Sequence, residues 1–269
     1  MEFIYAICLG VVQGLTEFLP VSSSGHLILL HQWLPIGLAD QMSFDVVLHL
    51  GTLVAVVWLF WSDLRQVARD WLTSFTPGQS NRGRVGWLII IATIPAALLG
   101  ALFENKIEAA LRSPILVAIM LALVGGLLLW AERIGKQSRN FSELSFAESL
   151  GLGFAQALAL VPGTSRSGII TIAGMWLKLK REEAIRFAFL LSVPIIAGAS
   201  LKKIPTLWHE QLSSHQWLVL GVGFLSALLA GFLAIRFLLR YVQNHSLNIF
   251  AYYRFALAAI ILLLSILKI

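Results

Sequence analysis

The chain contains six apolar stretches, each long enough to cross a lipid bilayer as a helix, which takes about 17 to 25 residues. They lie near residues 43–61, 86–103, 114–131, 184–201, 216–238 and 250–268. Of the 269 residues, 58% are hydrophobic and only 13% are charged, whereas a soluble domain carries about 25% charged residues. The sequence therefore predicts an all-α polytopic membrane protein with six transmembrane helices.

Two short polar clusters interrupt the apolar sequence, and they resemble each other. The first runs from Gln13 to His26 and the second from Gln156 to Gly168. An offset of 143 residues pairs Gly10 with Gly153, Gln13 with Gln156, Ser22 with Ser165, Ser24 with Ser167, Gly25 with Gly168, Trp33 with Trp176 and Phe44 with Phe187. Because polar groups are costly at membrane depth, this duplicated pattern predicts a functional site.

Each polar cluster lies between two apolar segments that are too short to span a membrane. These are residues 3–18 and 24–34 in the first half, and 146–161 and 167–177 in the second. Pro20 and Pro162 break the helices at the clusters, which predicts two re-entrant helix-turn-helix hairpins. Each half adds three spans, an odd number, so the halves insert in opposite orientations. We expect an inverted-topology repeat within a single integral membrane domain, 1–269, with repeat 1 at about 1–135 and repeat 2 at about 144–269.

The distribution of Lys and Arg predicts how the chain is oriented. With the N-terminus outside, the inner loops carry thirteen of these residues, and the outer loops and tail carry five: Lys106, Arg112, Lys202, Lys203 and Lys268. The positive-inside rule then places both termini outside. Because the net charge of +6 comes from residues scattered between apolar spans, we expect membrane lipids as partners and no nucleic acid.

The second polar cluster has the composition of an anion site. Arg166 keeps its charge when buried, and its planar guanidinium suits phosphate oxygens. The residues around it open a helix after a proline, where free backbone N–H groups favour phosphate. Candidate substrate-binding residues are Gly163, Thr164, Ser165, Ser167, Gly168 and the preceding Gln156. In the alternative interpretation the arginine pairs with a structural carboxylate and the serines only cap the helix.

The first polar cluster supplies complementary groups. Gln13 and Glu17 are four residues apart and share a helix face, and Glu17 is a candidate ligand for a hard divalent cation. Ser23 and His26 are a candidate nucleophile and proton carrier, although helix capping also explains a run of serines. Ser22, Ser24 and Gly25 are candidate substrate-binding residues beside them. Under the offset Ser23 is equivalent to Arg166, so the two tips present a hydroxyl and a cation.

Asp45 and His49 form a further polar pair near the start of the first span. Their spacing of four residues places both side chains on one helix face. Two interpretations stay open: the pair lines the same cavity as the clusters, or it is a local contact within the helix.

The motifs QGLTEFLPVSSSGH at 13–26, FDVVLHLGTL at 44–53 and PGTSRSG at 162–168 resemble those of bacterial undecaprenyl-diphosphate phosphatases of the BacA/UppP type, the bacitracin resistance family. The resemblance covers the whole chain. It implies hydrolysis of a C55 isoprenyl diphosphate to the monophosphate carrier lipid of cell-wall synthesis, and with it bacitracin resistance. It also implies a multi-pass protein of the bacterial inner membrane with its N-terminus outside, and it leaves a homodimer open.

The same resemblance implies roles for individual residues. Ser23 and His26 match the family's proposed nucleophile and its proton partner, Arg166 matches the phosphate-binding arginine, and Glu17 with Gln13 matches the acidic motif linked to metal dependence. Many members have Glu where this chain has Gln13. One carboxylate then remains, so we expect a divalent cation, Mg²⁺ or Ca²⁺, that binds Glu17 and relies mainly on the substrate's own phosphates.

A transporter is the rival from another class. Inverted repeats whose broken helices meet near the membrane midplane are a transporter architecture, so the same site would suit a flippase of a lipid phosphate. Phosphate release in detergent micelles distinguishes a phosphatase from a transporter. A micelle does not separate two compartments, so hydrolysis can be measured there and transport cannot.

Overall fold

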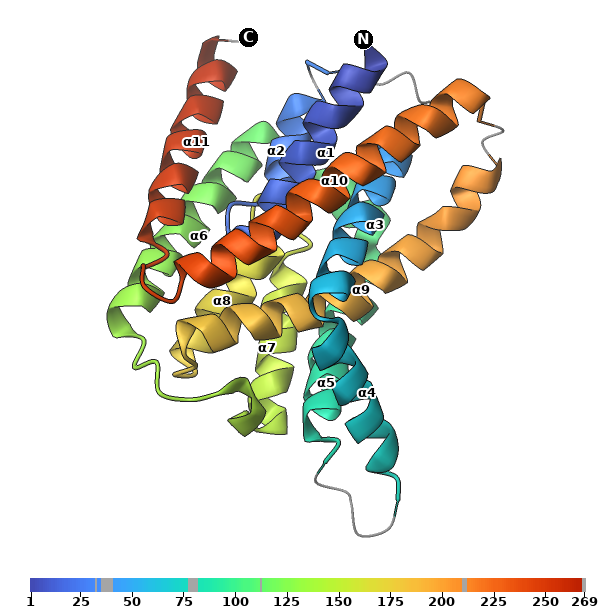
Figure 1. Cartoon of the computed structure of the whole chain (residues 1–269). Helices are drawn as coiled ribbons and strands as arrows, with labels where there is room; N and C mark the ends of the chain where they lie inside the picture. The colour runs from blue at the N-terminus through green and yellow to red at the C-terminus, as the bar shows by residue number, and fades with distance from the viewer. Residues whose placement is uncertain (32, 35–40, 77–81, 112, 210–211, 268–269) are drawn as a thin grey trace.

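The computed structural model describes all residues except 32, 35–40, 77–81, 112, 210–211 and 268–269 (Figure 1). The described residues are helical and contain no strand beyond one isolated bridge between Arg139 and Leu179. The helices are α1 (Glu2–Phe18), α2 (Ser23–Leu30), α3 (Gln41–Leu59), α4 (Trp61–Thr73), α5 (Arg84–Leu111), α6 (Pro114–Ile134), the short 3₁₀ helix η1 (Phe141–Glu143), α7 (Phe146–Leu158), α8 (Arg166–Trp176), α9 (Arg181–His209), α10 (Ser214–Tyr241) and α11 (Asn248–Leu267).

Five of these helices are long and apolar enough to cross a membrane: α5, α6, α9, α10 and α11. Helix α3 reaches the same standard only together with α4, from which it is bent by 77°, and this pair raises the number of candidate spans to six. The prediction of an all-α polytopic membrane protein is confirmed. Helix α4 was not predicted. Its sequence mixes charged and apolar residues, so its mean hydropathy is too low to indicate a transmembrane span.

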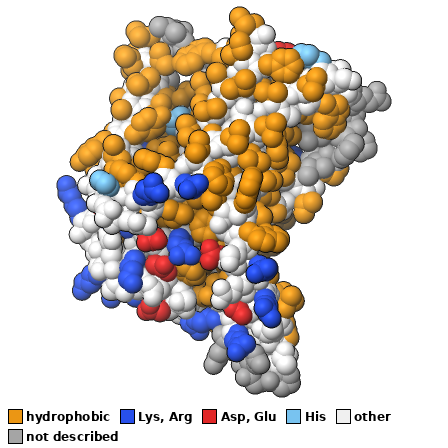
Figure 2. All heavy atoms as spheres, viewed as in Figure 1, with side chains coloured by type: hydrophobic (Ala, Val, Ile, Leu, Met, Phe, Trp, Pro, Cys, Tyr) orange, Lys and Arg blue, Asp and Glu red, His pale blue; other side chains and the backbone are white. Residues whose placement is uncertain are grey.

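Apolar side chains cover the upper part of the molecular surface, whereas Lys and Arg gather at the lower end (Figure 2). Both termini lie at the opposite, upper end (Figure 1). This arrangement agrees with a chain whose basic loops share one side of a membrane. Of the five residues expected in outer loops, Arg112 and Lys268 lie outside the described residues, as does the side chain of Lys106.

The two polar clusters form the tips of two helical hairpins, α1–α2 and α7–α8. Helix α1 packs against α10, and α7 packs against α5. Both crossings are close at equivalent glycines: a Cβ on Gly10 would lie 2.5 Å from the carbonyl oxygen of Gly223, and one on Gly153 would lie 2.7 Å from that of Ala92. The two hairpins therefore make equivalent close crossings with their neighbouring helices, whereas the inverted-topology repeat and the re-entrant position in a bilayer stay predictions.

A buried arginine on α11 ties the two hairpin tips together. Arg254 is fully buried, and its guanidinium donates hydrogen bonds to five backbone carbonyls, those of Pro20, Met120, Leu121, Gly163 and Thr164. Pro20 belongs to the first tip, and Gly163 and Thr164 belong to the second. Since a buried cation is tolerated only when its donors are satisfied, this network fixes the two tips relative to each other.

Candidate active site

The tips of the two hairpins are in direct contact. Ser167, on the second tip, donates a hydrogen bond from its hydroxyl to the carbonyl oxygens of Glu17 and Leu19 at 3.2 and 3.3 Å. Across the same contact, the backbone N–H of Gly163 donates to the Ser24 hydroxyl at 3.5 Å. Segments about 140 residues apart in the sequence thereby form one site.

The two tips repeat the same local backbone structure. Ser22 and Ser165 both have positive φ, 76° and 72°, which is uncommon outside glycine and costs conformational energy. Each serine hydroxyl accepts a hydrogen bond from the N–H three residues on, Gly25 at 3.4 Å and Gly168 at 3.2 Å. Helix α2 begins in the first tip and α8 in the second. The N-termini of both helices, which carry the positive end of the helix dipole, therefore lie at the contact between the hairpins.

A polar cavity of about 60 Å³ lies where the tips meet. Its lining contains six of the predicted site residues together with His49 and Ala159: Glu17, Ser22, Ser23, Ser24, Ser165 and Arg166. The arrangement joins the candidate nucleophile of the first tip to the candidate phosphate clamp of the second.

Glu17 is the central acceptor of this cavity. Its Oε2 atom accepts hydrogen bonds from the Ser23 hydroxyl at 2.6 Å and from the Gln13 amide at 3.0 Å. The Nε2 atom of His49 lies 3.4 Å from the same oxygen, and Nη1 of Arg166 lies 3.8 Å from Oε1. A short hydroxyl-to-carboxylate bond is a strong, charge-assisted one, so Glu17 rather than His26 is placed to receive the Ser23 proton.

Arg166 has donors to spare. Its side chain makes no hydrogen bond to any described residue, its nearest carboxylate is the loose Glu17 contact at 3.8 Å, and its buried Nη1 atom lacks a partner. An unsatisfied guanidinium nitrogen buried at a cavity is costly. An anion with several oxygens, such as a phosphate, would satisfy it bidentately.

His26 lies outside this cavity. Its Nδ1 atom lies 2.7 Å from the Ser22 carbonyl oxygen, and its Nε2 atom lies 2.7 Å from the Tyr253 hydroxyl. The rings of His26 and Tyr253 are also stacked. A carbonyl only accepts, so Nδ1 carries the hydrogen and Nε2 accepts from Tyr253. The expected pair between Ser23 and His26 is not formed in this structure, and the catalytic role of His26 stays a prediction.

His49 occupies the place in the cavity that was expected of His26. Its Nδ1 atom lies 2.8 Å from the Asp45 carbonyl oxygen, so Nδ1 is the donor and Nε2 faces the Glu17 carboxylate. A proton on Nε2 would be stabilised there by the carboxylate, because two bare lone pairs would repel each other. Asp45 itself pairs with His31 at 2.8 Å. The open question from the sequence is answered: His49 lines the cavity, and Asp45 does not.

The remaining predicted site residues hold the tips in place. The Gln156 amide donates to the Ala92 carbonyl oxygen at 3.2 Å and attaches the second hairpin to α5. Gly163 has a φ of +92° and, like Thr164, presents its carbonyl to Arg254. Gly25 and Gly168 donate to the capping serines. Sequence reasoning missed Arg254, and its only signal was a charged residue at the start of an apolar span.

The donor atoms around the cavity do not form a metal cage. In the described part of the chain, no group of three or more His, Cys, Asp and Glu side chains comes close enough to hold an ion. Glu17 is the one carboxylate among the described residues that line the cavity, and it already accepts two hydrogen bonds. The site fits a divalent cation only as one protein ligand among phosphate and water oxygens.

Comparisons with known proteins agree on one family. The family model of the bacitracin resistance protein BacA matches residues 6–260. An undecaprenyl-diphosphatase from Rubrobacter xylanophilus is 49% identical over 274 residues, which cover 99% of this chain and 100% of that protein. Undecaprenyl-diphosphatases from Moorella thermoacetica and Nitrosococcus oceani are 45% and 43% identical, over 97% of this chain in each case and 97% and 98% of theirs.

Proposed function

This chain belongs to the bacitracin resistance protein BacA family, and we propose that it is a membrane phosphatase that hydrolyses undecaprenyl diphosphate to undecaprenyl phosphate and inorganic phosphate. The reaction recycles the carrier lipid of cell-wall synthesis. It also confers bacitracin resistance, because that drug sequesters the diphosphate. The observation that carries the proposal is the cavity in which the Ser23–Glu17 hydrogen bond faces the free donors of Arg166.

In the proposed reaction, the diphosphate enters the cavity while its hydrocarbon chain stays among the membrane-facing helices. Arg166 and the N-terminal ends of α2 and α8 neutralise charge on the terminal phosphoryl group. This stabilisation is the largest part of phosphoryl-transfer catalysis. The free nitrogen of Arg166 supports this role, since it lacks any other partner among the described residues.

Ser23 is the proposed nucleophile. Its Oγ attacks the terminal phosphorus, its proton passes to Oε2 of Glu17 over the 2.6 Å hydrogen bond, and the bond from that phosphorus to the bridging oxygen breaks. The lipid monophosphate leaves with the bridging oxygen. Water then attacks the phosphoserine, inorganic phosphate is released, and the serine regains its proton. If water attacks directly instead, Glu17 takes the proton from that water.

His49 has a proposed supporting role through Glu17. The proton held at its Nε2 atom, 3.4 Å from the carboxylate, keeps Glu17 oriented and anionic before attack. His26 has a different environment, because its two ring nitrogens are engaged by Ser22 and Tyr253. A matched pair of variants separates the two histidines: if Glu17 is the acceptor, His49→Gln alters the acid limb of the pH–rate profile more than His26→Gln does.

A divalent cation, Mg²⁺ or Ca²⁺, is the proposed cofactor. Bound between Glu17 and the substrate's phosphates, such an ion would neutralise charge on the transferring group. Gln13 donates a hydrogen bond from its amide to Glu17. Because Gln13 is neutral, Glu17 is the only carboxylate that the described cavity residues offer to a cation. We therefore expect the chain to bind the cation weakly without substrate and well with it.

The placement in the cell is also part of the proposal. The membrane is the bacterial inner membrane, and both termini are outside. The grouping of both termini at one end and of basic side chains at the other supports this orientation (Figures 1 and 2). A homodimer stays a prediction, which mass measurement in detergent would test.

Phosphate release from a C15 or C55 isoprenyl diphosphate by the purified chain in detergent micelles tests the proposed function. We expect turnover by the wild type, inhibition by EDTA, and loss of about 10²-fold or more in kcat for Glu17→Gln, because a general base is lost. A folded wild-type chain that binds the diphosphate but releases no phosphate would favour the rival flippase. Wild-type kcat for Ser23→Ala would transfer the nucleophile's role to water.

A further inference from the structure

Helix α4 lies at the end of the molecule opposite the termini (Figure 1). A wide groove runs along this helix. Its volume is about 1510 Å³. Most of α4 lines it, α3 and α9 contribute Val57 and Val193, and the segment before α5 contributes Arg82. No residue of this groove lines the catalytic cavity. The α4 residues in its lining include Trp61, Arg65, Arg69, Asp70 and Leu72.

The groove carries positive charge that the described residues leave unneutralised. Arg65 and Arg69 are four residues apart and share a face of α4, and Arg82 also lines the groove. None of the three has a hydrogen bond or ion pair with a residue that the structure describes. Among the described residues of the lining Asp70 is the only acidic one, so these residues give the groove an excess of two positive charges.

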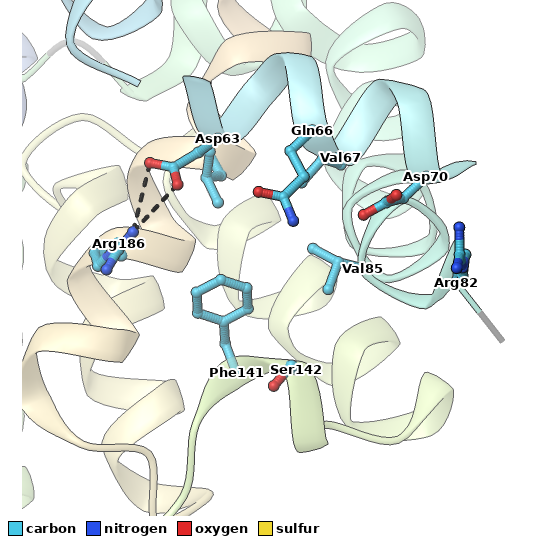
Figure 3. Close-up of a pocket in the computed structure, with 11 residues that line it drawn as sticks. Asp63, Gln66, Val67, Asp70, Arg82, Val85, Phe141, Ser142 and Arg186 are labelled. Atoms are coloured by element: carbon cyan, nitrogen blue, oxygen red, sulfur yellow. Dashed lines mark hydrogen bonds and ion pairs between the residues drawn. The ribbon is translucent and has the colours of Figure 1, made fainter. Parts of the chain in front are cut away.

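Neighbouring arginines are neutralised by carboxylates. Arg186 lies 3.4 Å from both oxygens of Asp63, at one end of a smaller cleft of about 200 Å³ between α4 and α5 (Figure 3). Figure 3 also shows Asp70 and Arg82 at the other end of this cleft, with no ion pair between them. Arg181 is likewise paired, with Glu132. Arg65, Arg69 and Arg82 differ from these two arginines, because none of them has a carboxylate partner among the described residues.

The same groove is apolar along its rim. Trp61 and Leu72 line it and are 60% and 63% exposed, and Trp58 stands exposed at the end of α3. Tryptophans are enriched at membrane–water interfaces. Helix α4 is bent by 77° from α3, and it carries both apolar and basic side chains, as amphipathic helices at a membrane surface do.

We propose that this groove binds the headgroup of an anionic phospholipid. The phosphate lies among Arg65, Arg69 and Arg82, and an acyl chain follows Trp61, Leu72 and Val193. A soluble anion would match the charge and leave the apolar rim unused, whereas a zwitterionic lipid would match the rim and bring no net charge to the arginines. Basic residues near a membrane surface attract anionic lipids in this way.

Native mass spectrometry of delipidated full-length chain, titrated with phosphatidylglycerol or phosphatidylcholine, tests the proposal. We expect phosphatidylglycerol to bind the wild type more tightly than phosphatidylcholine. The double variant Arg65→Gln/Arg69→Gln should weaken phosphatidylglycerol binding by about tenfold or more. Phosphate release from the diphosphate substrate should stay unchanged, since both residues are remote from the catalytic cavity.

Arg133→Gln/Arg240→Gln is the matched control, because it removes the same charge from exposed arginines that lie outside the groove. The control should keep wild-type affinity for phosphatidylglycerol. Equal losses in the two double variants would reduce the effect to net charge and overturn the groove. Equal binding of the two lipids, or displacement of phosphatidylglycerol by equimolar inorganic phosphate, would overturn the lipid as its occupant.

Discussion

Two arginines lie at the hairpin tips, Arg166 at the start of α8 and Arg254 on α11, and they differ in how their donors are used. Arg254 is fully buried and donates to five carbonyls, two of which belong to the tip that carries Arg166. Arg166 lies at the cavity, makes no hydrogen bond to a described residue, and meets Glu17 only at 3.8 Å. Burial alone would rank Arg254 as the more unusual residue.

The difference shows that satisfaction of donors, and not burial, separates a structural cation from a functional one. A guanidinium whose donors are all used holds backbone segments together and has nothing left for a ligand. A guanidinium with an unused donor at a cavity retains binding capacity for an anion. The following predictions test this distinction.

Arg166→Ala should have the largest effect on catalysis. Removing the clamp takes away stabilisation of the transferring phosphoryl group, so we expect kcat/KM to fall by about 10³-fold or more. The thermal unfolding midpoint in detergent should stay near that of the wild type, because no described residue loses a hydrogen bond. Retained turnover, or a large fall in the midpoint, would mean that Arg166 belongs with Arg254 as a structural residue.

Arg254→Met should have the largest effect on stability. It removes the donor to five carbonyls at once, four of them in buried hydrogen bonds, and loss of one partner of a buried charged network costs about 3–5 kcal/mol. We expect the thermal unfolding midpoint in detergent to fall by about 10 °C, with Arg166→Met as the matched control. A variant that kept the wild-type midpoint and lost only turnover would break the distinction between the two arginines.

Gly163→Ala should have an intermediate effect on stability through the tip that Arg254 holds. Gly163 has a φ of +92°, and a Cβ there would lie 2.7 Å from the Val117 carbonyl oxygen. Backbone strain of this kind costs about 1–3 kcal/mol. Gly126→Ala is the control, because a Cβ at Gly126 would meet nothing within 4 Å. Equal midpoints for the two variants in thermal unfolding would show that the tip adapts to a side chain.

Much of the fold and part of the site could be predicted from the sequence. The lengths of the apolar stretches predicted the candidate spans. The offset of 143 residues paired Ser22 with Ser165, which have nearly the same φ and cap their helices in the same way. Sequence spacing could not distinguish His26 from His49, because the choice depends on how α3 packs beside α1. The sequence also could not predict that Arg254 binds backbone carbonyls, because every residue has a carbonyl and residue identity does not show which ones will face an arginine.

The smallest expected effect concerns Arg139, a third arginine, which is partly exposed and lies outside the candidate spans. Its guanidinium bonds to Glu148 at 2.8 Å and, together with the N–H of Ser145, lowers the pKa of that carboxyl from 4.5 to about 2. Because the folded-state pKa is the lower one, the stabilisation is complete above pH 4.5 and is lost as the pH falls towards 2.

Exposure screens this pair, so we expect it to contribute about 1 kcal/mol or less. Thermal unfolding of wild type and Glu148→Gln in detergent, from about pH 7 to about pH 3, measures it. The wild type should be slightly more stable at neutral pH, and its advantage should shrink as the medium becomes acidic. If Glu148→Gln lowered the unfolding midpoint as much as Arg254→Met does, a hydrogen bond to an exposed arginine would stabilise the fold as much as one to a buried arginine. Burial would then have no influence on what a satisfied guanidinium contributes.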